Sequence, residues 1–208
     1  MDIPLFPLNV VLFPGTTMPL HLFEPRYRQL LADVRTGDQR FGLLCSIPGV
    51  PEREVPTGRI GSMAEVTEVE MLPDGRANIV VRGVGRFALG GYVEAPTPYH
   101  QGTVELVDDG PVTNPVALAV AADELAGHFR RIVKAVDTLR PEPGPSPVLS
   151  DHPVALAWQI AAMVDLDFEM RVELLASTDP ADRVTRLDRL LRKVLPELEL
   201  RAALNPAR

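Results

Sequence analysis

The chain has 208 residues, of which 46% are hydrophobic and 24% charged, a balance that is typical of a folded, soluble protein and excludes an intrinsically disordered one. No apolar run reaches the length of a membrane span, and the N-terminus lacks the basic and apolar regions of a secretion signal, so we expect no membrane partner and a cytoplasmic location. The formal net charge of −7 argues against nucleic acid as a partner, because phosphate backbones are bound by clustered Lys and Arg.

Short β-rich runs, separated by proline and glycine, fill the first part of the chain. One helix is predicted among them at Pro25–Arg35, where apolar residues share a single helical face. Apart from the hairpin described next, strands are predicted at 3–8, 10–13, 18–23, 41–47, 92–95 and 103–107.

The segment Leu72-Pro73-Asp74-Gly75-Arg76 predicts a hairpin turn, because proline presets φ and glycine accepts positive φ. In the strand before the turn, the apolar residues change parity between Val66 and Val69, which predicts a β-bulge. The strand after the turn alternates as far as Leu89, with Gly83 and Gly85 on its apolar face. Several short, bulged strands around one helix predict a small β-barrel.

Beyond residue 110 the apolar residues follow a helical period. Asn114 and Pro115 predict a helix start, and the apolar stripe that follows runs to Val136. A proline-rich connector at 141–147 ends this helix. Three further helices are predicted at 154–164, from Asp167 to about 176, and from Asp179 onward with Pro196 as a candidate bend. The fold class is therefore α+β, with four helices in a C-terminal subdomain.

One string, Gly83-Val84-Gly85-Arg86-Phe87-Ala88, matches the dinucleotide-binding fingerprint. That fingerprint requires a helix to begin at its glycines, so that the pyrophosphate meets the helix N-terminus. Here the glycines continue a strand instead. The pattern favours close packing or bending of that strand over nucleotide binding.

Other chemical signals are equally weak. Ser146 and Ser150, with Lys193 downstream, suggest a Ser–Lys dyad, but Ser146 lies between prolines in a flexible connector and Lys193 lies on a polar helix face. The lone Cys45 excludes an internal disulfide, and its apolar neighbours indicate a buried residue. The four histidines have no metal-binding spacing and there is no P-loop motif, so we expect no catalytic residue, no metal and no other cofactor.

The most distinctive pattern is the N-terminal stretch 3–15, IPLFPLNVVLFPG, followed by 19–28, PLHLFEPRYR. It resembles the opening of the Lon protease N-terminal domain, particularly in stand-alone bacterial members. Three further motifs follow in the family's order, namely 59–66 RIGSMAEV, 72–76 LPDGR and 80–87 VVRGVGRF. The resemblance is specific over about residues 3–108, and the later helices match in order alone.

This resemblance implies a PUA-like pseudo-barrel followed by a helical bundle. We expect a LON-like β-barrel subdomain at 1–110 and a helical subdomain at 111–208. In Lon this region helps to select substrates, which implies a protein that binds unfolded polypeptide or a protein partner. The sequence ends at Arg208, before the ATPase and protease domains of Lon would begin, so no enzymatic activity is expected.

Polar residues around an exposed corner are the candidates for a polypeptide-binding rim. The alternative interpretation is that the tyrosine packs into the barrel and the arginines are ordinary surface residues. A rival function is RNA binding, because other PUA-like barrels bind RNA, although no segment interleaves basic and aromatic residues. The candidate rim residues are Glu24, Arg26, Tyr27, Arg28, Arg82 and Arg86.

Overall fold

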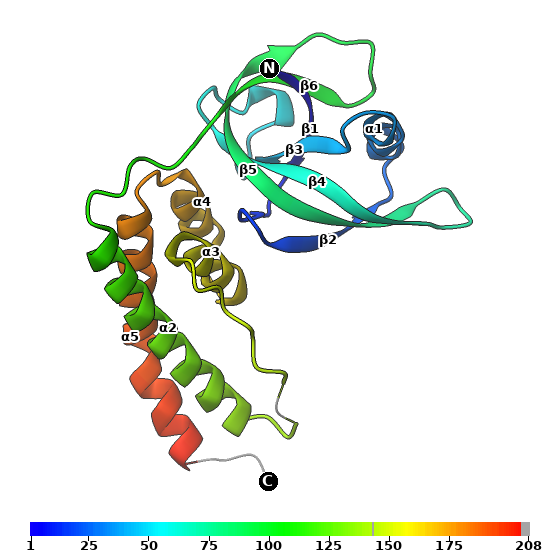
Figure 1. The fold of residues 1–208 in the computed structure, drawn as a ribbon. Coiled ribbons are helices and arrows are strands. Elements are labelled where there is room, and N and C mark those ends of the chain that lie inside the picture. The colour runs from blue at the N-terminus through cyan, green and yellow to red at the C-terminus, as the bar shows by residue number, and fades with distance from the viewer. Residues whose placement is uncertain (143, 205–208) are drawn as a thin grey trace. The chain divides into compact units, whose positions relative to one another are not determined.

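A computed structural model describes residues 1–142 and 144–204 of the chain and shows an α+β fold (Figure 1). The strands are β1 (Asp2–Leu8), β2 (Thr17–Leu22), β3 (Arg40–Cys45), β4 (Ile60–Met71), β5 (Ala77–Val93) and β6 (His100–Leu106). The α-helices are α1 (Pro25–Arg35), α2 (Pro115–Thr138), α3 (Pro153–Met163), α4 (Phe168–Ala176) and α5 (Pro180–Leu204), and a 3₁₀ turn covers Glu52–Glu54. Within the described residues, no helix is long and apolar enough to span a membrane.

The six strands form one mixed sheet that closes on itself. Its order is β2-β5-β4-β3-β1-β6, and β5 also pairs with β6. The β1–β3 pair is parallel and the other pairs are antiparallel. The strands β5, β4, β3, β1 and β6 therefore form a complete circuit of pairings, to which β2 is attached along the first half of β5.

Bulges let the long strand β5 bend around this circuit. The predicted bulge in β4 is confirmed, because the register shifts between Val66 and Glu68 and leaves Thr67 as the extra residue. A second shift leaves Val84 of β5 unpaired, and a third leaves Gly90 unpaired opposite β6. Each extra residue bends its strand and increases the local twist.

Two predicted strands differ from the structure. Residues 10–13 form no strand, although Leu12 and Phe13 are fully buried, and only Pro14 forms an isolated bridge with Gly83. The segment is apolar because it fills the interior as an irregular connection. No separate strand begins at residue 92, in contrast to the prediction for 92–95. Instead β5 continues through the bulge at Gly90 and ends at Val93.

Two clusters of buried side chains fill the interior of the sheet unit. The larger packs α1 against β2, β4 and β5, with Tyr27, Leu30 and Ile79 among its members. The smaller packs around Phe87 of β5, which pairs with Gly61 of β4. The apolar face predicted for Pro25–Arg35 is therefore the face that α1 buries.

The helices begin where the sequence predicts. The Asn114 side chain accepts a hydrogen bond from the Ala117 N–H at 3.0 Å, and the Asp167 side chain accepts one from Met170 at 2.8 Å. These side chains satisfy backbone donors that a helix N-terminus leaves free. Helix α5 continues through Pro196 to Leu204.

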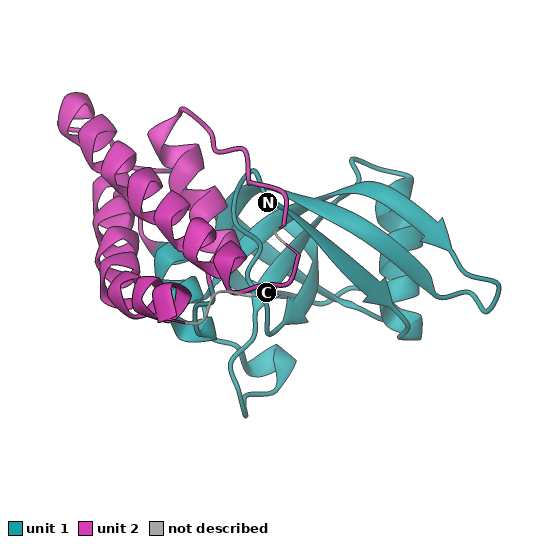
Figure 2. Ribbon diagram, turned by 90° about the horizontal axis from the view of Figure 1, so that it is seen from below, with its two compact units in different colours: residues 1–108, 165–176 teal, residues 109–164, 177–208 magenta. Residues whose placement is uncertain are grey.

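The chain divides into two compact units, which Figure 2 shows in different colours. The first comprises Met1–Asp108 and Asp165–Ala176, and the second comprises Asp109–Val164 and Ser177–Arg208. Helix α4, expected among four helices of a C-terminal subdomain, thus belongs with the sheet. The physical reason is that α4 contacts β4, and its last turn accepts a hydrogen bond from the buried Arg86 of β5 to the Leu175 carbonyl at 2.8 Å.

In the second unit, α2, α3 and α5 pack on one another around a fully buried arginine, Arg183. Its guanidinium donates to both carboxylate oxygens of Asp109, at 2.8 and 2.6 Å, and to the Ser177 carbonyl at 2.7 Å. The same group lies 3.9 Å from the ring centroid of Trp158 on α3. One side chain thus ties the first residue of the unit to α3 and to the start of α5.

Candidate functional site

The corner that precedes α1 is organised by Arg26. Its guanidinium makes two parallel hydrogen bonds to the Glu52 carboxylate, at 2.6 and 2.9 Å, and its Nε donates to Glu24 at 2.8 Å. Such a two-pronged pair fixes geometry more firmly than a single contact. Two of the predicted rim residues, Glu24 and Arg26, therefore lie together, but in an internal ion network that holds α1 to the 3₁₀ turn.

Glu52 is the centre of this network. His100 Nε2 lies 3.1 Å from its carboxylate, and Tyr92 donates a hydrogen bond to its backbone carbonyl. Burial of the Glu52 carboxyl opposes ionisation, but the hydrogen bonds and charge of Arg26, with a further contribution from His100, outweigh it and lower the pKa. Four segments of the first unit thus meet at one residue, Glu52.

Replacing Arg26 by methionine should lower the free energy of unfolding at pH 7 by about 1 kcal/mol, after allowance for partial solvent screening. A carboxyl whose pKa is depressed in the folded state contributes stability above its unfolded pKa and loses it as pH falls through the folded value. The difference between wild type and Arg26→Met should therefore shrink below pH 4.5, the ordinary value for glutamate.

Urea denaturation at pH 7 and pH 3.5 measures this difference. Arg53→Met is the matched control, because Arg53 and its partner Glu94 are both exposed. Its effect should be small at either pH. A stability loss at Arg26 that stays constant from pH 7 to 3.5 would contradict the assigned role of the Glu52 pair.

Tyr27 and Arg28 also make contacts within the first unit. Tyr27 is buried against Phe6, with ring centroids 3.8 Å apart, and burial with the nearby Glu52 charge raises the pKa of its hydroxyl. Tyr27 thus agrees with the alternative interpretation of the sequence, in which the tyrosine packs into the barrel. Arg28 lies beneath the hairpin tip, where one terminal nitrogen is 3.4 Å from the Asp74 carbonyl and would touch any Cβ placed on Gly75.

The two strand arginines have different surroundings. Arg82 is exposed and binds Glu65 at 2.7 Å, and Arg40 binds the same carboxylate at 3.0 Å. Arg86, a candidate for the exposed rim together with Arg82, is buried, so that expectation is wrong. Arg86 and Phe87 are successive residues of a strand, so their side chains point to opposite faces of β5. The face on which Arg86 lies is covered at this position by α4, which is why the arginine is buried.

An exposed apolar pair was missed among the candidate residues. Phe23 directly follows β2 and is 61% exposed, and Met71 ends β4 and is 56% exposed. Leu22 and Met71 both pair with Ala77 of β5, so Phe23 and Met71 lie at the ends of the two strands that flank β5. The sequence signal was available, because Phe23 lies in the same motif as the charged residues at 24–28.

The weak chemical signals stay weak in the structure. Gly83 and Gly85 lie within β5, away from any helix start, as predicted. Cys45 is buried, and burial raises the pKa of its thiol to about 12, so it is a poor nucleophile at neutral pH. The described residues contain no group of three or more potential metal ligands among His, Cys, Asp and Glu.

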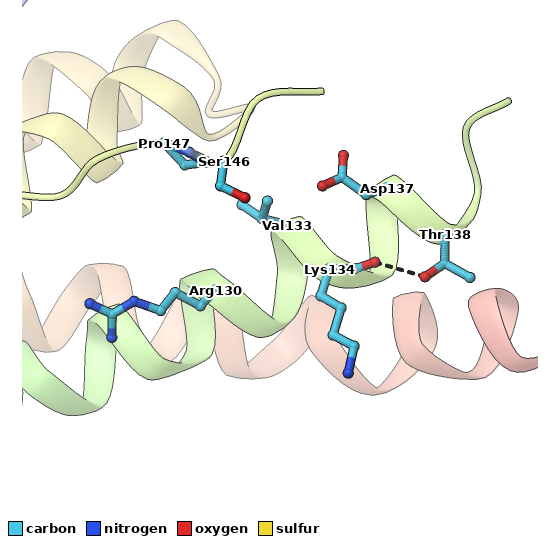
Figure 3. Close-up of a pocket in the computed structure, with 7 residues that line it drawn as sticks. All are labelled: Arg130, Val133, Lys134, Asp137, Thr138, Ser146 and Pro147. Atoms are coloured by element: carbon cyan, nitrogen blue, oxygen red, sulfur yellow. Dashed lines mark hydrogen bonds between the residues drawn. The ribbon is translucent and has the colours of Figure 1, made fainter. Parts of the chain in front are cut away.

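A surface hollow of about 540 Å³ lies between α2 and the connector that follows it (Figure 3). Ser146 and Pro147 line it from the connector, and Arg130, Val133 and Lys134 line it from α2. The Lys134 side chain points away from Ser146 in Figure 3, and Lys193 is not among the lining residues. The hollow therefore holds no serine–lysine arrangement.

Comparison with known proteins agrees with this architecture. Residues 2–193 match the family model described as the ATP-dependent protease La (LON) substrate-binding domain. Lon protease of Syntrophomonas wolfei subsp. wolfei is 26% identical over 98% of this chain, and Lon protease 4 of Sorangium cellulosum is 31% identical over 90%. The chain spans only about a quarter of these relatives, 25% and 23% of their lengths.

Two solved structures share the fold. The Lon N-terminal domain protein from Xanthomonas campestris matches with a TM-score of 0.63 and 25% identity, over 90% of this chain and 96% of its own. The N-terminal domain of Mycobacterium avium complex Lon protease matches with a TM-score of 0.64 and 20% identity, over 92% and 98%. The fold is thus that of Lon N-terminal domains. The chain belongs to the LON substrate-binding domain family.

Proposed function

We propose that this chain binds polypeptides, in particular unfolded segments, without acting on them chemically. The observation that carries the proposal is the match of residues 2–193 to a substrate-binding domain. The exposed Phe23 and Met71 support it, because binding an unfolded segment requires apolar surface bordered by polar groups.

A finer description of the fold accompanies this proposal. A PUA-like pseudo-barrel is supported by the closed circuit of strand pairings, and a C-terminal helical bundle by the mutual packing of α2, α3 and α5. We keep the proposed subdomains at 1–110 and 111–208 as divisions of the sequence, with α4 as the one segment of the second range that groups with the sheet. For the rival RNA-binding function, the exposed arginines Arg40 and Arg82 offer little support, because both are paired with Glu65.

The proposed function predicts that the chain binds an unfolded protein more tightly than the same protein in its folded state. Only the unfolded form offers apolar segments, and ordering it on binding limits the affinity. Fluorescence anisotropy with labelled α-lactalbumin, reduced and carboxymethylated or native, measures the difference. We expect a dissociation constant in the micromolar range for the unfolded form and weaker binding of the native form.

Titration of a labelled RNA at two salt concentrations distinguishes the rival RNA-binding function from polypeptide binding. RNA binding would fall steeply as salt rises, because counterions are released from the phosphates, whereas binding of apolar segments would change little. Tighter binding of RNA than of unfolded polypeptide would overturn the proposal. So would the absence of polypeptide binding at concentrations of tens of micromolar.

A further inference from the structure

Strand β2 has an unpaired edge. The circuit of β5, β4, β3, β1 and β6 gives each of its strands two neighbours, whereas within residues 1–142 and 144–204 β2 pairs with β5 alone, from Thr17–Arg82 to Leu22–Ala77. Figure 1 shows β2 at the margin of the sheet. An edge of this kind presents backbone donors and acceptors that another strand can use.

The main-chain groups at this edge can be assigned. The Thr16 carbonyl accepts a hydrogen bond from the Gly83 N–H at 3.0 Å and so points toward β5. Because a trans peptide directs its N–H opposite to its carbonyl, the N–H of Thr17 points away from β5, and so do the backbone groups of Pro19 and His21. Outside the β2–β5 ladder, no backbone hydrogen bond to these three residues occurs in the described part of the chain.

Proline at the middle of β2 fits this assignment. Pro19 lacks an N–H, and a strand tolerates proline where that N–H would face away from the ladder. It reduces the edge to two outward donors, those of Thr17 and His21, and three outward carbonyls. The edge is thus partly blunted, and the two donors that remain have three residues between them along the strand.

The inner side of the same edge is apolar and incompletely covered. Met18 and Leu20 point inward onto the core that contains Tyr27, yet both are only half-buried, because no further strand covers them. Directly after β2, the exposed Phe23 lies beside the ring of His21, with centroids 6.1 Å apart, and so on the side of the strand opposite to Met18 and Leu20. A segment lying along the edge would bury apolar side chains at every second position.

Two exposed carboxylates lie on β4, which is separated from β2 by β5. Glu68 and Glu70 of β4 are exposed, and neither forms an ion pair within the described residues. Glu70 accepts a hydrogen bond from Asn78 at 2.8 Å, and Asn78 in turn contacts His21 of β2 at 2.8 Å. Basic side chains on the outward positions of an added segment would be favoured here, and acidic ones repelled.

We propose that an extended polypeptide segment adds to β2 as a further strand, hydrogen-bonded to Thr17, Pro19 and His21. Its inward side chains are apolar and cover Met18 and Leu20, and its outward side chains are polar or basic. This inference rests on the proposed polypeptide binding and assigns it a surface and a mode: main-chain pairing provides affinity for many sequences, and alternation provides selectivity.

The first test uses a labelled peptide of alternating valine and lysine, and the same peptide with glutamate in place of lysine. Hydrogen exchange followed by NMR should show the amides of Thr17 and His21 protected at saturation with the lysine peptide. The glutamate peptide should bind at least about fivefold more weakly. Protection of these amides that depends on protein concentration and not on peptide would indicate strand pairing between two copies, and would overturn the proposal.

The second test uses His21→Pro, which removes one outward donor without removing a bond to β5. The matched control is His21→Ala, which keeps the N–H and loses the same contact with Asn78. His21→Pro should weaken the lysine peptide at least about fivefold, as expected for one lost hydrogen bond, and His21→Ala less than about twofold. Equal effects of the two substitutions would overturn the proposal, and hydrogen exchange of the wild-type chain remains decisive if His21→Pro does not fold.

The experiments distinguish failure of the proposed binding surface from failure of the proposed function. If unfolded α-lactalbumin and the lysine peptide bind, but Thr17 and His21 stay unprotected and His21→Pro binds normally, the edge of β2 is not the surface and polypeptide binding stands. If neither ligand binds at tens of micromolar, the proposed function fails and this inference fails with it.

Discussion

Alanine in place of Arg183 should lower the free energy of unfolding of the helical unit by about 3 kcal/mol. The fully buried guanidinium binds Asp109, the Ser177 carbonyl and the face of Trp158, so truncation removes these hydrogen bonds and leaves an open space beside the indole. Urea denaturation followed by the fluorescence of Trp158, the single tryptophan of the chain, measures the loss.

Two further variants separate charge from geometry. Arg183→Lys keeps the charge but cannot reproduce the two parallel bonds to Asp109, so its loss should be intermediate. Arg201→Ala removes an exposed arginine paired with Glu197 on the same helix and should cost less than about 1 kcal/mol. Equal stability losses for Arg183→Ala and Arg201→Ala would show that the buried arginine is not the organising contact of this unit.

Alanine at Gly83 should destabilise the sheet unit by about 1–3 kcal/mol, whereas alanine at Gly85 should be nearly neutral. A Cβ at Gly83 would lie 2.4 Å from the backbone oxygen of Phe13, which cannot move as a side chain can. Gly83 also exchanges backbone hydrogen bonds with Gly15 and Thr16, at 2.8 and 3.0 Å, so the strand cannot shift outward easily.

Gly85 is the natural control, because it lies two residues away in the same strand. A Cβ there would meet only the Cβ of Met63, at an ordinary contact distance of 3.9 Å. From the sequence both glycines are expected on one crowded face, but the structure crowds Gly83 alone. Urea midpoints from circular dichroism distinguish the two, and equal midpoints for Gly83→Ala and Gly85→Ala would contradict this placement.

Local signals in the sequence were sufficient for much of the fold. Capping by Asn114 and Asp167 and the bulge near Val66 each depend on a few adjacent residues, and the structure confirms all three. The N-terminal motif was sufficient for the family, because several short patterns occur in the correct order.

What the sequence did not reveal depends on contacts between distant residues. Buried Arg86 looks like a surface arginine until α4, almost ninety residues later, supplies the Leu175 carbonyl. Glu52 gives no local signal, because its partners Arg26 and His100 come from other segments. The open edge of β2 is equally invisible, since it is defined by which strands fail to pair with it.

The order in which the chain is synthesised has a consequence for its first unit. Asp2 of β1 pairs with Thr103 of β6, so the ring of strands can close only after about half of the chain has been made. The unit then still lacks α4, because residues 109–164 of the other unit come in between. During that interval the guanidinium of Arg86 has no Leu175 carbonyl to bind, and the face of β4 that α4 covers is exposed to water and to other nascent chains.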